Sequence, residues 1–237
     1  MGKEPAWRSS WTGAQLTVRR LHILCEGQTE EIIARDVIAP HFAAMEIWVS
    51  LSIFTTKRPA GGPAFKGGLS RWPKLERELR MLLGDTSITV LTTMFDYYAF
   101  PADAPGMVDR PRGSPHVRVQ HVESGLAEAI HDRRFLPNLV LHEIEAWVLA
   151  DCGRLGQVMG DGAPAADLDR IVQLESGPEL VNDGVATAPS KRIMNAYPQY
   201  AKTIDGPLVI AEAGLGSIRD SCPHADDWLR EIQSRLV

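Results

Sequence analysis

The stretch that most constrains the fold is SITVLTTMF, residues 87–95, which is apolar or β-branched at almost every position. It lacks the alternation of apolar and polar residues that marks a half-exposed strand, and is typical of a central strand buried on both faces. A sheet covered by helices on both faces is an α/β architecture with parallel strands. The stretch therefore predicts a doubly wound sheet with this strand in its interior.

Strand and helix patterns alternate along the first two thirds of the chain. The strand patterns cover residues 18–25, 46–54, 87–95 and 135–142, and the helix patterns cover 29–40, 71–84, 118–132 and 143–151. Thr29 is expected to cap the first helix, and Pro40 to stop it, because proline has no backbone N–H for the helical hydrogen bonds. Four alternations predict a mostly parallel, four-stranded sheet.

The C-terminal third has a different pattern. Strand signals fade from about residue 153, and short amphipathic stretches at 167–174 and 226–236 predict helices. The expected organisation is an N-terminal extension, an α/β core, and a helical C-terminal elaboration packed on that core. These parts cover residues 1–17, 18–152 and 153–237.

Composition excludes several classes of protein. No run approaches the roughly 18 apolar residues of a membrane span, and the N-terminal residues lack the apolar stretch of a secretory signal. The three cysteines are widely spaced, which favours reduced thiols over a disulfide framework or a zinc site. A cytoplasmic protein is predicted. Its formal net charge of −5 means that any nucleic-acid contact must come from a local basic patch.

Acidic residues follow three of the predicted strands. Glu26 follows the first, Asp96 the third, and Glu143 with Glu145 the fourth. Ligands of open parallel sheets bind at the carboxyl ends of the strands, so these acids are expected to converge there. A hard cation such as Mg²⁺ or Mn²⁺ offsets their repulsion and prefers oxygen ligands. Each acid alone is as well explained by solvation or helix capping, but the joint pattern favours a metal site.

The two neighbouring glutamates are not equivalent in this prediction. Residues two apart on a helix lie on different sides, so only one of Glu143 and Glu145 is expected to be a ligand. Glu145 is slightly favoured, because the free N–H groups of the first helical turn can orient its carboxylate.

Two sets of basic residues are candidates for binding phosphate. Lys191 and Arg192 follow Thr187, which resembles a helix cap, so basic side chains and helix N–H groups meet there. The alternative is a solvated helix face. The Gly-rich segment 55–70 and its surroundings carry the second set, Lys57, Arg58, Lys66 and Arg71. This segment has no GxxxxGK[ST] motif and is not predicted to bind a nucleoside triphosphate.

Other polar residues have weaker signals. Cys222 and His224 lack a second pair of zinc ligands, so a role at a helix start is expected instead. His142 is either a proton shuttle or a hydrogen-bonded histidine at a strand end. Tyr97 and Tyr98 either stack on a base or wall the pocket.

Five motifs occur in an order that resembles a bacterial family known as domain of unknown function 4276. They are EGQTEE, FDYYAFP, LHEIEAWVLAD, NDGVATAPSKRI and GLGSIRDSCPHADDWL, and the resemblance covers roughly residues 18–237. That family is similar to the TOPRIM group of topoisomerases, primases and overcoming-lysogenization-defect nucleases. The similarity implies a TOPRIM-like sheet and assigns Glu26 and Asp96 to metal binding.

The chain departs from the TOPRIM pattern at one position. TOPRIM domains carry Asp-x-Asp after the third strand, whereas this chain has Asp96, Tyr97 and Tyr98. The resemblance then implies that Glu143 or Glu145 supplies the missing carboxylate. One-metal and two-metal chemistry both stay open.

The resemblance implies a divalent-metal-dependent phosphodiester hydrolase that acts on nucleic acid. Such domains often work beside an ABC-type ATPase in defence against phage, so an ATPase partner in trans is expected. One alternative is a hydrolase or transferase acting on a small nucleotide at the same carboxylates. The other is a cation-binding regulatory or interaction module without turnover.

Overall fold

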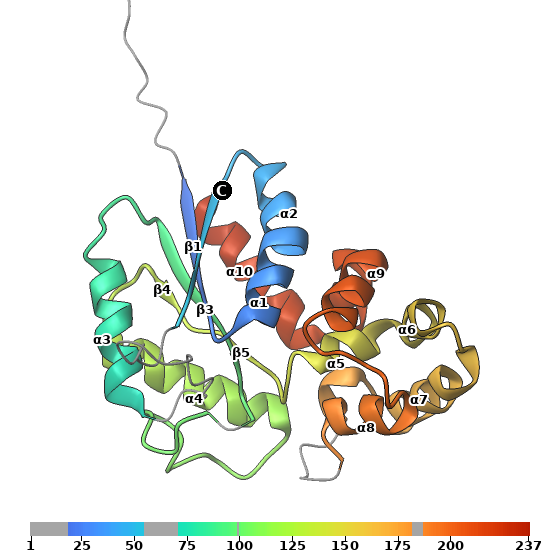
Figure 1. Cartoon of the computed structure of the whole chain (residues 1–237). Helices are drawn as coiled ribbons and strands as arrows, with labels where there is room; N and C mark the ends of the chain where they lie inside the picture. The colour runs from blue at the N-terminus through green and yellow to red at the C-terminus, as the bar shows by residue number, and fades with distance from the viewer. Residues whose placement is uncertain (1–18, 55–70, 99, 182–186) are drawn as a thin grey trace, which may run out of the picture.

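The computed structural model describes residues 19–54, 71–98, 100–181 and 187–237. The expected N-terminal extension therefore lies outside the described residues. The sheet is open and all its strand pairs are parallel, in the order β2-β1-β3-β4, with β5 also paired to β3. Its strands are β1 (Arg20–Cys25), β2 (Trp48–Ile53), β3 (Val90–Asp96), β4 (Phe135–Leu136) and β5 (Leu139–Val140). The predicted parallel α/β fold is confirmed (Figure 1).

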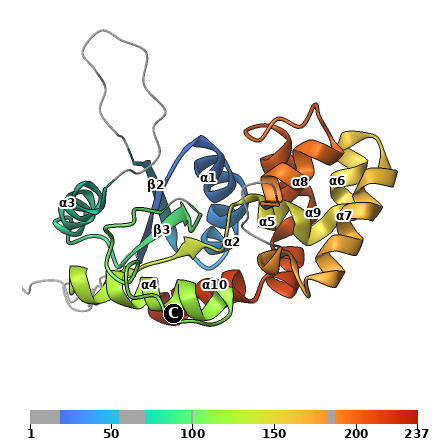
Figure 2. The same ribbon diagram turned by 90° about the horizontal axis from the view of Figure 1, so that it is seen from below.

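Helices cover both faces of this sheet and continue into a C-terminal helical region (Figures 1 and 2). The part of the chain up to residue 130 contributes α1 (Gln28–Ile33), α2 (Ala39–Ala43), α3 (Trp72–Leu83) and α4 (Pro115–Ile130). The second half contributes α5 (Glu145–Val148), α6 (Cys152–Met159), α7 (Gly162–Leu174), α8 (Pro189–Ala196), α9 (Asp205–Ser221) and α10 (Pro223–Leu236). One hydrophobic cluster contains α3 and α4, and the other contains α1, α2 and α10.

The central strands send alternate side chains into these two clusters. In β1, Ile23 belongs to the cluster under α1 and α10, while Leu24 belongs to the cluster under α3 and α4. In β3, Met94 and Phe95 divide in the same way. Because successive side chains of a strand point to opposite faces, a strand covered on both sides must be apolar throughout. This explains the apolar run from which the fold was predicted.

The first helix does not stop at Pro40. A five-residue π-helix, Ala34–Ile38, joins α1 to α2, and Pro40 falls in the first turn of α2. The wider turn shifts the hydrogen-bond register, so the missing proline N–H falls where a new helical turn begins. The predicted Thr29 cap is also wrong: Gly27 is the N-cap, and its backbone N–H donates to Glu30 Oε2 at 2.9 Å.

The predicted strand over 135–142 is divided into β4 and β5 by Pro137 and Asn138. Proline has no N–H for the strand ladder. Asn138 instead donates its side-chain N–H to the Thr93 carbonyl at 3.1 Å, and its own carbonyl accepts from Thr93 Oγ1 at 2.8 Å. The sheet therefore continues past the proline through side-chain hydrogen bonds.

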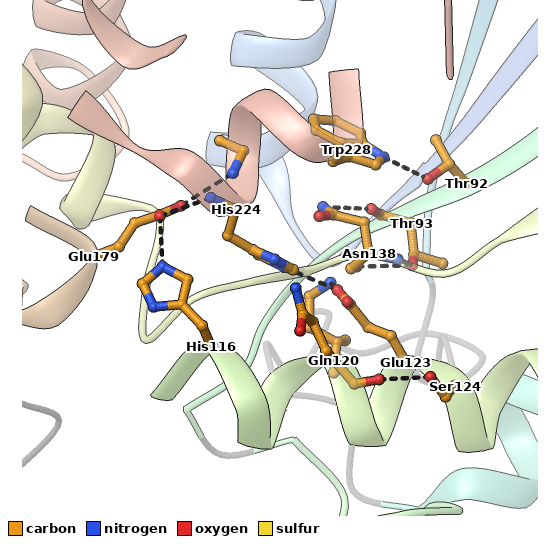
Figure 3. A network of polar contacts seen from close by, with 12 residues as sticks. Thr92, Thr93, His116, Gln120, Glu123, Ser124, Asn138, Glu179, His224 and Trp228 are labelled. Atoms are coloured by element: carbon orange, nitrogen blue, oxygen red, sulfur yellow. Dashed lines mark hydrogen bonds and ion pairs between the residues drawn. The ribbon is translucent and has the colours of Figure 1, made fainter. Parts of the chain in front are cut away.

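A buried polar network attaches α10 to α4 and to the sheet (Figure 3). His224 Nε2 lies 3.0 Å from Glu123 Oε1, and Trp228 Nε1 donates to Thr92 Oγ1 at 2.8 Å. Glu179, in a 3₁₀ turn (Pro178–Leu180), accepts the His224 backbone N–H at 2.9 Å. His224 is thus part of a network with two carboxylates at the start of α10, in keeping with its predicted place at a helix start.

Cys25, Cys152 and Cys222 are buried free thiols, as predicted. Within the described ranges, no helix is both long enough and apolar enough to cross a membrane.

Candidate functional site

Glu26 and Asp96 meet at the carboxyl ends of two adjacent strands. The Glu26 backbone N–H donates to the Met94 carbonyl at 2.9 Å, and the Asp96 backbone N–H donates to Glu26 Oε2 at 3.1 Å. After β1 the chain turns to one side of the sheet, toward β2, and after β3 it turns to the other, toward β4. This point, where the winding direction reverses, is the usual ligand site of open α/β sheets.

Glu143 and Glu145 reach the same edge from the segment that follows β5. The backbone N–H of Ile144, between them, donates to Asp96 Oδ1 at 2.9 Å. His142 turns the chain there with a left-handed backbone (φ 65), and its carbonyl accepts the Tyr98 N–H at 2.8 Å. The helical-spacing argument against a joint role does not apply, because α5 begins only at Glu145.

The two glutamates have different partners. Glu143 Oε2 accepts the Ser190 backbone N–H at 3.1 Å, in the first turn of α8. Glu145 Oε1 lies 3.1 Å from Lys202 Nζ. Both glutamate side chains are buried. The Ser190 N–H at the start of α8 therefore faces a protein carboxylate, and the buried carboxylate of Glu145 is paired with a partly exposed lysine.

The structure does not bring the predicted phosphate-binding residues together into one site within the described residues. The N-cap of α8 is Ala188, so the Thr187 cap is wrong. Lys191 is exposed, and Arg192 Nε donates to the Thr187 carbonyl at 2.9 Å. Lys57, Arg58 and Lys66 lie outside the described residues, and Arg71 is exposed at the N-cap of α3.

Two residues at this edge are absent from the sequence-based site. Glu30, in the first turn of α1, is buried at 7% exposure and contacts the Gly27 N–H. Its position in a first turn suggested only a favourable helix-dipole interaction. Lys202, in the turn before α9, had no local signal at all. Glu26, Glu30, Asp96, Glu143 and Glu145 are called the acidic cluster below. The helices α1 and α5, in which Glu30 and Glu145 lie, both pack against α9 (Figure 1).

Four members of the acidic cluster have a raised pKa, namely Glu26, Glu30, Asp96 and Glu145. Burial raises the pKa of Asp96 well above its usual range, and the charges of Glu30, Glu26, Glu145 and Glu143 raise it further. Burial also raises the pKa of Glu26 to about 7, although the hydrogen bond from the Asp96 N–H opposes this. Burial is the largest cause of the raised pKa of Glu30 and of Glu145. Both the low local polarity and the mutual repulsion favour protonation or a bound cation.

The raised pKa of Glu26 predicts a pH-dependent stability of the metal-free protein. On folding, this pKa rises from 4.5 to about 7. The protonated Glu26 side chain therefore stabilises the folded protein fully below the unfolded pKa, and this stabilisation is lost as the pH rises through the folded pKa. We expect the free energy of unfolding to fall between about pH 5 and about pH 8, and Glu26→Gln to reduce that fall. Urea denaturation in EDTA measures it; an identical pH profile in Glu26→Gln would contradict it.

The donor atoms of the acidic cluster suit a hard divalent cation, because all of them are carboxylate oxygens. Their side chains are not yet arranged around a cation. Over 19–54, 71–98, 100–181 and 187–237, no three His, Cys, Asp or Glu side chains form a metal-ligating group. One oxygen of each carboxylate instead contacts a backbone N–H or Lys202. A cation fits this donor set chemically, and binding it requires side-chain rotation.

Tyr97, Tyr98 and His142 differ in how far they are buried. Tyr97 is buried in the hydrophobic cluster under α3 and α4, and its hydroxyl accepts from Arg110 Nη1 at 3.0 Å, so its ring is not available for stacking on a base. Tyr98 is 37% exposed beside Asp96 and is the ring available for stacking. His142 is buried at the turn before Glu143, and its role as a proton shuttle stays a prediction.

Comparison with known proteins gives one match. A family model described as "Domain of unknown function (DUF4276)" matches residues 25–233. The chain belongs to this family. The DUF4276 match includes the whole acidic cluster and Lys202. No curated protein and no solved structure matches the chain.

Proposed function

We propose that this DUF4276 protein is a divalent-metal-dependent phosphodiester hydrolase that acts on nucleic acid, with the acidic cluster as its metal site. The convergence of five carboxylates at the switch point of the sheet carries this proposal. They come from three segments that are distant in the sequence, after β1, at the end of β3 and at the start of α5. Holding them together is costly unless a cation offsets their charge.

The residues present can be assigned roles. Glu26 and Asp96, with Glu143 or Glu145, would hold the metal ion. When bound, the ion supplies an acidified water and offsets charge on the phosphate oxygens. Tyr98 lies exposed at the edge of the site, where an aromatic ring can stack on an unpaired base.

The wider setting is part of the same proposal. Similarity to the TOPRIM nucleases supports a nucleic-acid substrate and an ATPase partner in trans, with a role in defence against phage. We also propose a cytoplasmic location. The net charge of −5 limits the nucleic-acid contact to local cations such as Lys191 and Arg192.

A second candidate is a cation-binding regulatory module without turnover. The absence of a preformed ligating group among the described residues favours it. A module that binds its cation only after side-chain rotation can use the cation as a signal, because the ion then selects one of two conformations.

Titration with Mn²⁺ and Mg²⁺ tests the metal site directly. A cation that binds only the folded protein at 100 times its Kd stabilises it by about 2.7 kcal/mol. For a chain of this size we expect Tm to rise by about 5–10 °C. The absence of a shift at millimolar metal would count against the site.

Nicking of supercoiled plasmid separates the two candidates. Metal-dependent nicking, lost in EDTA, supports the hydrolase. A rise in Tm without nicking supports the regulatory module. Glu231→Gln, on the exposed surface of α10, is a control that should leave both readouts unchanged.

A further inference from the structure

Lys202 lies over the acidic cluster from a separate part of the chain. Its Nζ is 3.1 Å from Glu145 Oε1, and its side chain is 41% exposed whereas that of Glu145 is 3% exposed. Ion pairs between two exposed side chains contribute little. Here the ammonium offsets the charge of a buried carboxylate. Removing the lysine would leave that charge buried without a counter-charge and would destabilise the fold.

The backbone around Lys202 is fixed by hydrogen bonds. Ala201 donates its N–H to Asp205 Oδ2 at 2.7 Å, and its carbonyl accepts from the Ile204 and Asp205 N–H groups at 2.9 and 2.8 Å. These contacts close the turn that leads into α9. The ammonium is therefore held near the cluster by the fold, rather than by the flexible side chain alone.

Several carboxylates act on this ammonium. Partial burial lowers the pKa of Lys202, but the charges of Glu145, Glu143 and Asp96 raise it more. In turn, the charge of Lys202 favours the ionised form of Glu30. Lys202 thus interacts with most members of the cluster, at a position where a positive charge is needed.

We propose that Lys202 is the internal cation of the acidic cluster: its ammonium occupies the place of a second divalent cation at Glu145. The native protein then binds a single divalent ion, on the Glu26 and Asp96 side. The inference rests on the proposed function, because it takes the cluster to be a cation site, and it assigns one-metal rather than two-metal binding.

The test is equilibrium dialysis against Mn²⁺ with metal analysis, together with thermal unfolding in EDTA. The native protein is expected to bind one Mn²⁺ per chain. Lys202→Gln should bind a second ion, or bind the first about tenfold more tightly because a competing charge is gone. Its metal-free form should unfold at a lower temperature than the native protein. Lys202→Arg keeps the charge and should bind one ion, whereas Lys74→Gln, on the exposed face of α3, controls for loss of a lysine.

Each outcome is decisive. Two ions in the native protein, or one ion with unchanged affinity in Lys202→Gln, would overturn the role of Lys202 and leave the metal site in place. No ion in any variant would overturn the proposed function and this inference together. An ion bound only by Lys202→Gln would contradict the single ion proposed for the native protein and would reject a native metal site. If Lys202→Gln fails to fold, two ions bound by Lys202→Arg, which keeps the charge, would still contradict the proposal.

Discussion

Glu26→Gln is expected to lower divalent-cation affinity about a hundredfold while leaving the metal-free fold as stable as the native protein or more stable. The amide oxygen can still accept the Asp96 N–H that Glu26 Oε2 accepts at 3.1 Å. The substitution removes a carboxylate whose ionisation is opposed by burial and by the charge of Glu30. At pH 8 the gain in unfolding free energy is at most on the order of 3 kcal/mol, from 1.36 kcal/mol per unit of pKa.

The measurement is a metal titration beside chemical denaturation in EDTA. Asp96→Asn should behave in the same way, because its amide oxygen can accept the Ile144 N–H. Glu231→Gln is the surface control. A structural acid would give the opposite result, since neutralising a required acceptor costs about 1–3 kcal/mol. Destabilised metal-free variants with native metal affinity would show that Glu26 and Asp96 only organise the strand ends.

The sheet and the first two members of the site could be predicted from local patterns. A strand buried on both faces has a continuous apolar run, and SITVLTTMF is such a run. Parallel strands end at one edge, so the residues after β1 and β3 must be neighbours once the two strands are adjacent. Glu26 and Asp96 follow from this rule alone.

The remaining parts of the site depend on contacts that no local pattern encodes. Lys202 reaches Glu145 only because α9 packs against α5, and that packing is set by many small contacts distant in the sequence. Glu30 resembles an ordinary first-turn acid, and only the tight turn at Gly27 brings it into the cluster. Pro40 does not end the helix, contrary to the prediction, because the π-helix before it removes the hydrogen bond that proline cannot make.

Glu179→Gln is expected to destabilise the fold by about 3 kcal/mol, mainly by loosening α10. The Glu179 side chain is 2% exposed, and its two oxygens accept the backbone N–H groups of His224 and Ala225 at 2.9 and 3.1 Å. These N–H groups belong to the first turn of α10, which has no side-chain cap of its own. A glutamine amide has only one acceptor oxygen, so its NH₂ group would face a second buried donor.

The loss of stability should affect α10 before it affects the sheet edge, because both backbone contacts of Glu179 are made to the start of α10. His116 Nε2 also lies 3.2 Å from Glu179 Oε2 and connects the same carboxylate to α4. Urea denaturation gives the change in unfolding free energy, and hydrogen exchange reports whether the α10 amides lose protection first. Glu231→Gln, which removes an exposed contact to Arg235 on the same helix, should cost no more than about 0.5 kcal/mol. If the two variants were equally stable, the Glu179 contacts would not be what fixes α10 to the core, and the contacts of His224 with Glu123 and of Trp228 with Thr92 would be left as its buried polar anchors.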